Sequence, residues 1–92
     1  MEYIISYHPD VKKTDLPKID QKTKFVIKKA IEKRLTVNPQ NYGKPLQKTL
    51  KGYWKLRVGN YRVVFKIEQN LLIILGIIHR KDVYRKIQNR LI

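Results

Sequence analysis

Residues 53–67 read YWKLRVGNYRVVFKI and alternate between apolar and basic side chains on either side of Gly59-Asn60. Successive side chains of a β-strand point to opposite faces, so this alternation predicts a hairpin with one apolar face and one charged face. The charged face would carry the following cations: Lys55, Arg57, Arg62 and Lys66. Because like charges on neighbouring strands repel each other, so basic a face requires an explanation beyond folding.

The segment before the hairpin predicts one strand and two helices. Residues 3–8 read as a strand, and Pro9 suits the first position of a short helix that ends near residues 17–19. Asp20 is a good N-cap for a second helix, which ends at Asn38-Pro39. The core face of this helix is marked by apolar residues at helical spacing: Ile27, Ala30, Ile31 and Leu35.

The remaining segments predict a loop, a central strand and a last helix. Residues 39–51 carry the breakers Gly43 and Pro45 and are expected to form a loop. Residues 71–78 follow a turn at 68–70, and their apolar character on both faces is typical of a strand covered on both sides. Residues 80–90 are expected to form the last helix, packed through Val83 and Ile87.

The predicted fold is a single α+β domain spanning residues 1–92, a small sandwich in the order strand, helix, helix, three antiparallel strands, helix. The chain has no cysteine, which fits a reducing compartment and excludes disulfides and thiolate metal sites. Its start lacks the basic and apolar regions of a signal peptide, and its longest apolar run, residues 71–78, is too short to span a bilayer. We therefore expect a soluble, cytoplasmic protein with no membrane partner.

The charge of the chain is unusually one-sided. The formal net charge is +14, and no acidic residue occurs between Glu32 and Glu68. Such a segment of a single sign predicts the footprint of a polyanion, either nucleic acid, an acidic protein or both. The cations of this central segment are Lys33, Arg34, Lys44, Lys48, Lys51, Lys55, Arg57, Arg62 and Lys66.

The stretch GKPLQKTLKGYWKLRVGNYRVVFKI, followed by IIHRKDVY, resembles the RelE branch of the RelE/ParE toxin superfamily. The shared pattern comprises Leu50, Gly52-Tyr53-Trp54, the strand pair from Lys55 to Arg62, and the late element from His79 to Tyr84. The resemblance implies a RelE-like fold over nearly the whole chain. It also implies a type II toxin that enters the A site of the 30S ribosomal subunit and cuts messenger RNA there. The implied partners are the ribosome, mRNA and a cognate antitoxin with an acidic segment, which would form a toxin–antitoxin hetero-oligomer.

In this reaction the RNA supplies its own nucleophile, because the 2′-hydroxyl can attack the adjacent phosphate. The protein must help to remove the proton of that hydroxyl, stabilise the pentavalent phosphate and protonate the leaving oxygen. Arg62 is the first candidate for the phosphate, since a guanidinium binds two phosphate oxygens and stays charged. Arg80, which follows the central strand at the predicted start of the last helix, is the second candidate.

Lys55 and His79 are the candidates for proton transfer. Crowded positive charge favours the neutral form of a lysine, so Lys55 could act as a base, as a proton carrier or as a point charge on phosphate. Many RelE relatives carry a second lysine two positions earlier, where this chain has Tyr53. His79 could replace the missing group, because imidazole titrates near neutrality.

Tyr84 completes the catalytic set predicted from the sequence, and lies four residues after Arg80. Its ring could stack on a splayed base, its hydroxyl could bind the 2′-hydroxyl, or the residue could simply pack the helix on the sheet. The residues expected to bind RNA outside the reaction centre are Lys44, Lys48, Lys51, Tyr53, Arg57 and Lys66. No cofactor and no metal site are expected, because the acidic residues and histidines are scattered along the sequence.

Two alternatives to an RNA-cutting enzyme remain open at this point. A ParE-like toxin would have the same fold and would inhibit DNA gyrase, although such relatives generally lack the combined Lys, Arg, His-Arg and Tyr set. A non-catalytic basic module, or an inactivated toxin, would bind ribosomal RNA or the ribosome without cutting. The residue Tyr53, in place of the second lysine, keeps this last alternative open.

Overall fold

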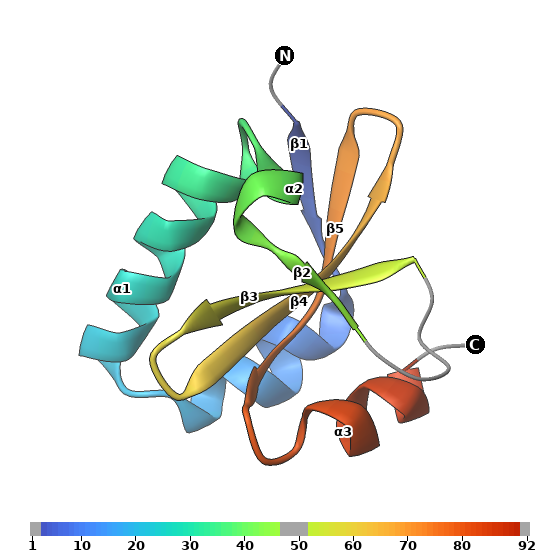
Figure 1. Cartoon of the computed structure of the whole chain (residues 1–92). Coiled ribbons are helices and arrows are strands. Elements are labelled where there is room, and N and C mark those ends of the chain that lie inside the picture. Colours follow the sequence, from blue (N-terminus) through green and yellow to red (C-terminus); the bar gives the residue numbers. More distant parts are fainter. Residues whose placement is uncertain (1–2, 47–51, 91–92) are drawn as a thin grey trace.

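The computed structural model describes residues 3–46 and 52–90, which form one five-stranded sheet and its covering helices (Figure 1). The strand order is β1-β5-β4-β3-β2, with β1 parallel to β5 and the remaining neighbours antiparallel. The strands are β1 (Ile4–Tyr7), β2 (Lys44–Pro45), β3 (Tyr53–Val58), β4 (Tyr61–Glu68) and β5 (Leu71–His79). The predicted α+β class and its three consecutive antiparallel strands are confirmed.

The predicted helical pair is also present. The first helical segment comprises η1 (Val11–Asp15) and η2 (Leu16–Lys18), and the second comprises α1 (Gln21–Ala30) and its wider continuation η3 (Ile31–Leu35). Asp20 caps α1 as predicted, because its carboxylate accepts a hydrogen bond from the Thr23 amide at 3.2 Å. The N-cap therefore fixes where α1 begins after η2.

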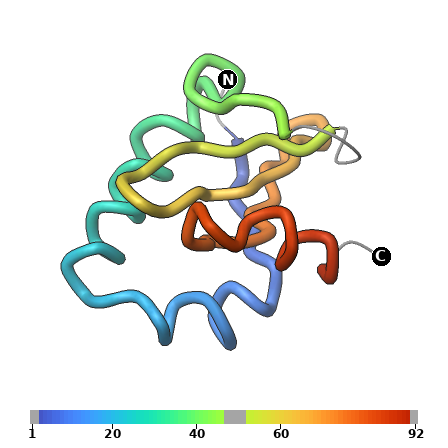
Figure 2. Tube along the Cα trace, turned by 60° about the horizontal axis from the view of Figure 1, so that its bottom comes forward, coloured from blue at the N-terminus to red at the C-terminus, as the bar shows by residue number. Residues whose placement is uncertain are grey.

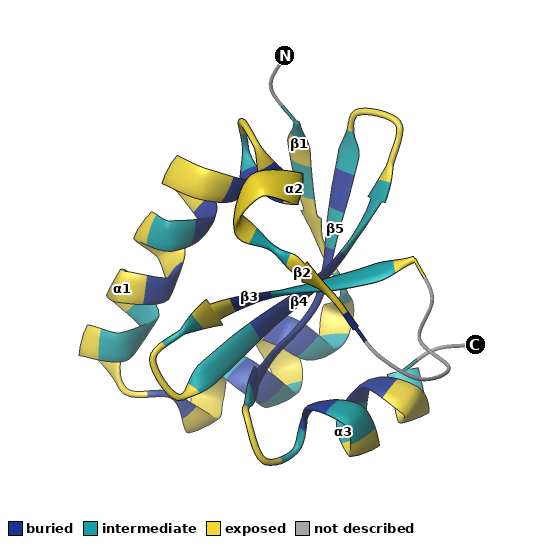
Figure 3. Cartoon of the chain, viewed as in Figure 1, coloured by how far each residue is buried: buried dark blue, intermediate teal, exposed yellow. Residues whose placement is uncertain are grey.

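The helical pair covers one face of the sheet, and the last helix, α3 (Val83–Arg90), covers part of the other (Figure 2). Ile27, Ile31 and Leu35 pack on the first face, together with β-strand residues such as Val63 and Phe65. On the second face, Val64, Leu75 and Ile78 are buried under Val83 and Ile87 of α3. The strand β5 therefore contributes buried residues to both layers. Figure 3 shows buried positions along much of this strand.

Residues 39–46 differ from the predicted loop. Pro39 begins the short helix α2 (Pro39–Tyr42), since proline is well suited to the first turn of a helix. Lys44 and Pro45 then form the edge strand β2, with Lys44 opposite Lys55. Proline is tolerated at an edge because no ladder hydrogen bond from its nitrogen is needed there. The rest of the predicted loop, residues 47–51, lies outside the described residues.

Residues 80–82 form a turn rather than the predicted first turn of the last helix, because α3 begins at Val83. The Arg80 amide donates to the Asn60 carbonyl at 2.9 Å, which ties this turn to the β3–β4 hairpin. By strand alternation Val64 lies on the same face of β4 as Arg62, but its side chain is buried because α3 covers it. The second face of the sheet is therefore basic only where α3 leaves it open.

A buried ion pair anchors the end of α3. Arg90 and Asp15 form two hydrogen bonds of 2.6 and 2.8 Å, and their side chains are only 6% and 2% exposed. Asp15 also accepts from the Ile77 amide at 2.9 Å, and Arg90 donates to the Leu75 carbonyl at 2.9 Å. The pair thus provides hydrogen-bond partners for the backbone of β5 beyond the end of its pairing with β1. It also links the helices on the two faces of the sheet.

Within residues 3–46 and 52–90, no helix combines the length and apolar character that crossing a membrane requires.

Candidate functional site

The register of the β3–β4 hairpin gathers the predicted cations on the partly open face of the sheet. Arg57 lies opposite Arg62, and Lys55 lies opposite Val64. Gly59 has φ +59°, a left-handed conformation that suits glycine in the tight turn joining the two strands. The turn therefore sets a register in which two arginines are direct neighbours.

A hollow of about 430 Å³ lies between this face and the start of α3. It brings together four of the five predicted catalytic residues, although they come from β3, β4, the turn after β5, and α3. Its lining residues are Lys55, Arg62, Arg80, Lys81, Val83 and Tyr84. The hollow is therefore basic, with one aromatic wall.

Arg62 is held by its own backbone rather than by an acid. Its Nη1 donates to the carbonyls of Gly59 at 3.1 Å and Tyr61 at 2.9 Å. Among the described residues, no carboxylate forms an ion pair with Arg62. Burial lowers the pKa of its guanidinium, and repulsion from Arg57 and Arg80 lowers it further. The side chain is thus positioned with uncompensated charge, as the binding of an anion requires.

Lys55 and Tyr84 are neighbours in the lining of the hollow. The Lys55 Nζ lies 5.9 Å from the centre of the Tyr84 ring, within the range of a cation–π contact. The buried neighbours Val83 and Ile87 fix α3 on the sheet and so place Tyr84 beside Lys55. Arg80 was expected at the start of the last helix, four residues before Tyr84, but a turn rather than a helix carries it into the hollow.

His79 is not part of this hollow. It pairs with Tyr61 across the sheet, and the two rings meet edge to face with centroids 5.7 Å apart. Its Nδ1 accepts a hydrogen bond from the Lys81 amide at 3.3 Å. The ring lines a separate hollow of about 110 Å³, together with Asp15 and Lys86. The structure therefore separates His79 from Lys55 and Arg62, with which the sequence grouped it.

The residues predicted to bind RNA fall into three groups. Lys44 and Arg57 line a hollow of about 230 Å³ that shares Lys55 and Arg62 with the first. Lys66 instead pairs with Glu68 at 3.0 Å and lies 5.8 Å from the Tyr53 ring centre. The hydrogen bond from Glu68 raises the pKa of Lys66. Lys48 and Lys51 lie outside the described residues.

The sequence prediction missed Lys81 and Tyr42, which line the first and second hollows. Lys81 directly follows Arg80, so its position in the charged run was the only available signal. Tyr42 had no signal, because residues 39–51 were expected to form a loop. In the described part of the chain, no group of three or more His, Cys, Asp or Glu side chains is arranged to hold a metal ion.

The sequence matches the family described as the ParE toxin of type II toxin–antitoxin system, parDE, over residues 5–84. The chain belongs to this toxin family. It is also 39% identical over 54 residues to toxin RelG of Mycobacterium tuberculosis, which covers 56% of this chain. The chain spans only 62% of the length of that relative.

Solved structures of toxins share the fold. The RelBE2 toxin–antitoxin complex of Mycobacterium tuberculosis matches with a TM-score of 0.79 and 26% identity, covering 87% of this chain and 100% of the matched one. The RelB–RelE antitoxin–toxin complex of Methanococcus jannaschii matches with a TM-score of 0.60 and 21% identity over 88% of this chain and 96% of that one. These comparisons confirm the predicted resemblance: the protein is a RelE-type toxin of the RelE/ParE superfamily.

Proposed function

We propose that this toxin is a ribosome-dependent endoribonuclease that cuts messenger RNA in the ribosomal A site and so inhibits translation. The observation that carries this proposal is Arg62, a partly buried guanidinium without a carboxylate partner in the described chain, in a hollow with Lys55, Arg80 and Tyr84. The hollow is open to solvent, and its cations come from three strands or turns of the fold. Such a lining suits a charged phosphodiester better than a small neutral substrate.

In the proposed reaction the 2′-hydroxyl attacks the adjacent phosphorus, and the bond to the 5′-oxygen breaks. The products are a 2′,3′-cyclic phosphate and a free 5′-hydroxyl. Arg62 binds the non-bridging oxygens, and Arg80 adds a second cation as negative charge develops on them. Binding in this geometry also aligns the attacking and leaving oxygens.

Proton transfer is assigned to Lys55. The lining groups able to exchange a proton are the amines of Lys55 and Lys81 and the hydroxyl of Tyr84, and Lys55 is the one in contact with the Tyr84 ring. As an ammonium group it protonates the leaving 5′-oxygen, while the proton of the 2′-hydroxyl passes to solvent. His79 has no part in this proposal, because its ring lies in a different hollow.

Tyr84 is assigned to the base next to the scissile phosphate. Its ring forms the aromatic wall of the hollow, and stacking on an unpaired base is sequence-tolerant. Tyr84→Phe should then retain cleavage within a few-fold, whereas Tyr84→Ala should reduce it by about tenfold or more. A Phe variant as defective as the Ala variant would instead assign the hydroxyl to the reaction.

The proposed partners follow from the same charge. The cytoplasmic ribosome and its mRNA are the targets, and a cognate antitoxin with an acidic segment is the inhibitor, forming a hetero-oligomer with the toxin. The solved relatives that are toxin–antitoxin complexes support an antitoxin partner. The proposal predicts that antitoxin and RNA compete for the basic hollow.

The test is primer extension on mRNA bound to ribosomes with an open A site, with a no-ribosome control. Wild type should give codon-phased cuts, and Arg62→Ala should reduce them by about a hundredfold or more, as expected when a donor to a developing oxyanion is lost. Arg62→Lys should not restore cutting, because an ammonium cannot bind two oxygens in the same way. Arg85→Ala is the matched control, since Arg85 is exposed and pairs with Asp82.

Absence of cuts with wild type, while the protein still arrests growth, would overturn the nuclease proposal. A gyrase supercoiling assay would then test the ParE-like alternative. Ribosome binding without cleavage products would point to the non-catalytic module.

A further inference from the structure

A third basic hollow is lined by the α1–η3 helix and by the end of β3, two elements that lie side by side in Figure 1. Its volume is about 440 Å³, and we call it the α1 groove. Its cationic lining comes from the helix and from the strand: Lys29, Lys33, Arg34 and Arg57. None of its lining residues is acidic. A concave surface of one sign attracts a polyanion.

The nearest acidic residue of the helix faces elsewhere. Glu32 lies between the groove cations in sequence, but it acts on Tyr7, whose pKa is raised by burial and then by this carboxylate. Tyr7 lines a different hollow, with Ile27 and Ile31, between the helices of the first layer. The helix therefore carries its carboxylate on one side and its groove cations on another.

Two exposed aromatic rings accompany the groove cations. Phe25 lines the groove and is 61% exposed, with the Lys29 Nζ 5.4 Å from its ring centre. Tyr42 is 51% exposed, with the Arg34 guanidinium carbon 5.7 Å from its ring centre. Exposed rings beside cations are the elements with which proteins bind single-stranded nucleic acid, through base stacking and phosphate contacts.

The groove is continuous with the candidate site through shared side chains. Arg57 lines both the α1 groove and the hollow that contains Tyr42 and Lys44. That hollow in turn shares Lys55 and Arg62 with the candidate site. The three hollows thus form one basic track from α3, across the β3–β4 hairpin, to α1.

We propose that the α1 groove binds single-stranded RNA that continues from the strand held in the candidate site, with Lys29 and Lys33 on phosphates and Phe25 stacked on a base. The proposal rests on RNA being the ligand of that site. Exposed rings with cations beside them favour RNA over an acidic protein, because a single strand supplies bases that stack on the rings and phosphates that bind the neighbouring cations. The groove would then contribute affinity without taking part in cleavage.

The test measures binding of a fluorescein-labelled, 2′-O-methylated single-stranded RNA as a function of salt. Methylation blocks the nucleophile, so binding is measured without cleavage. Lys29→Gln/Lys33→Gln should reduce the slope of log affinity against log salt by about 1.4, since each phosphate contact on a single strand contributes about 0.7. Phe25→Ala should weaken binding by about tenfold.

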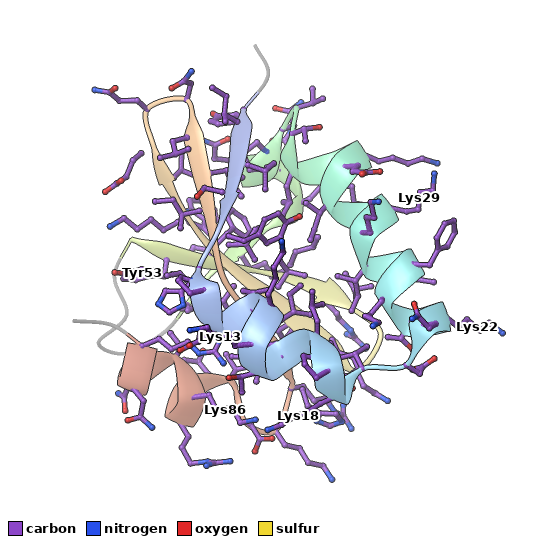
Figure 4. All side chains as sticks on the ribbon, turned by 180° about the vertical axis from the view of Figure 1, so that it is seen from behind. Lys13, Lys18, Lys22, Lys29, Tyr53 and Lys86 are labelled. Atoms are coloured by element: carbon purple, nitrogen blue, oxygen red, sulfur yellow. The ribbon has the colours of Figure 1, made fainter. Side chains whose placement is uncertain are left out.

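The matched control is Lys13→Gln/Lys18→Gln, which removes the same charge from η1 and η2. Figure 4 shows these lysines away from Lys29, which extends from the outer side of α1. The control should leave the slope within about 0.3 of wild type, well below the change expected for two lost phosphate contacts. Circular dichroism melts of all variants should superimpose on that of wild type. A reduced salt slope then reflects lost RNA contacts and not unfolding.

An unchanged slope in the groove variant, or an equal loss in the control, would overturn the proposal. If the groove variant instead lost antitoxin binding alone, the groove would belong to an acidic protein partner. The nuclease proposal is tested separately. Cleavage by wild type, together with an unchanged salt slope in the groove variant, would overturn only the groove proposal. A reduced salt slope in the groove variant, without cleavage by wild type, would uphold the groove proposal and overturn only the nuclease proposal.

Discussion

Arg57 on β3 lies directly opposite Arg62 on β4, and within the described residues neither forms an ion pair with a carboxylate. Cross-strand neighbours of like charge are destabilising, so this pair weakens the hairpin in the free protein. Arg62 lines the candidate site, Arg57 lines the α1 groove, and both line the hollow between them. The repulsion that destabilises the folded protein is therefore located where a bound anion would neutralise it.

Replacing one member of this pair should stabilise the free toxin. Arg57→Gln is expected to raise the free energy of unfolding by up to about 1 kcal/mol, measured by urea denaturation at low salt. The gain should shrink near 1 M salt, where the screening length falls to about 3 Å. Lys13→Gln, an exposed cation on η1, should change stability little. A loss of stability in Arg57→Gln would show that its charge or stem supports the fold.

The buried pair of Asp15 and Arg90 should behave in the opposite way. Arg90→Ala leaves the Asp15 carboxylate buried without its cation and is expected to cost about 3–5 kcal/mol in urea unfolding. Asp15→Ala/Arg90→Ala should cost less than the sum of the two single variants, because no lone charge remains buried. Strict additivity in this double-mutant cycle would argue against coupling between the two side chains.

Gly76 should resist enlargement. A Cβ at this position would lie 2.7 Å from Ile78 Cδ1 and 3.0 Å from Ile87 Cδ1 and Arg90 Nη1, under the end of α3. Gly76→Ala is therefore expected to cost about 1–3 kcal/mol of stability. Ile78→Val removes the closest of these atoms, so Gly76→Ala/Ile78→Val should be less destabilised than the sum of the single changes. Simple summation would locate the strain elsewhere.

The helix cap at Asp20 gives a dependence on pH. Its hydrogen bonds with Thr23 lower the pKa of the Asp20 carboxyl below its unfolded value. A lowered folded-state pKa means that the stabilisation is present above the unfolded value of about 3.9 and is lost as pH falls through the folded one. Asp20→Ala should lower the melting temperature at pH 7, and the gap from wild type should close in acid.

Asp20→Asn is the control for this prediction, because asparagine caps a helix without a titrating charge. Its melting temperature at neutral pH should lie near that of wild type. A gap between wild type and Asp20→Ala that stays constant into acid would mean that the carboxylate charge does not contribute to the cap.

Local patterns allowed much of the fold to be predicted. The β3–β4 hairpin follows from alternation around Gly59-Asn60, and α1 follows from Asp20 and the spacing of its buried residues. The parallel pairing of β1 with β5 has no such local mark, because it joins segments far apart in the chain. The short α2 and β2 were missed because Gly43 and Pro45 are signals for a loop as well as for an edge.

The candidate site was predictable where the hairpin register decides it. Lys55 and Arg62 share a face in the hairpin as expected, whereas the position of His79 depends on the pairing of β4 with β5. That pairing contains a register shift between Val64 and Phe65. Counting alternate residues along the sequence therefore does not predict which face of the sheet His79 occupies at the end of β5. The approach of Tyr84 to Lys55 depends on where α3 packs on the sheet; Val83 and Ile87 mark the buried face of this helix but not its position.

Asp15 and Arg90 are 75 positions apart, so their contact closes one of the longest loops in the chain. Contacts between such distant segments form slowly, because the entropy of loop closure opposes them, whereas a hairpin brings neighbours together early. We expect the β3–β4 hairpin to form well before α3 packs on the sheet. A partly folded chain would then present Lys55 and Arg62 before Tyr84 arrives, so the aromatic wall of the site would be its last component to assemble.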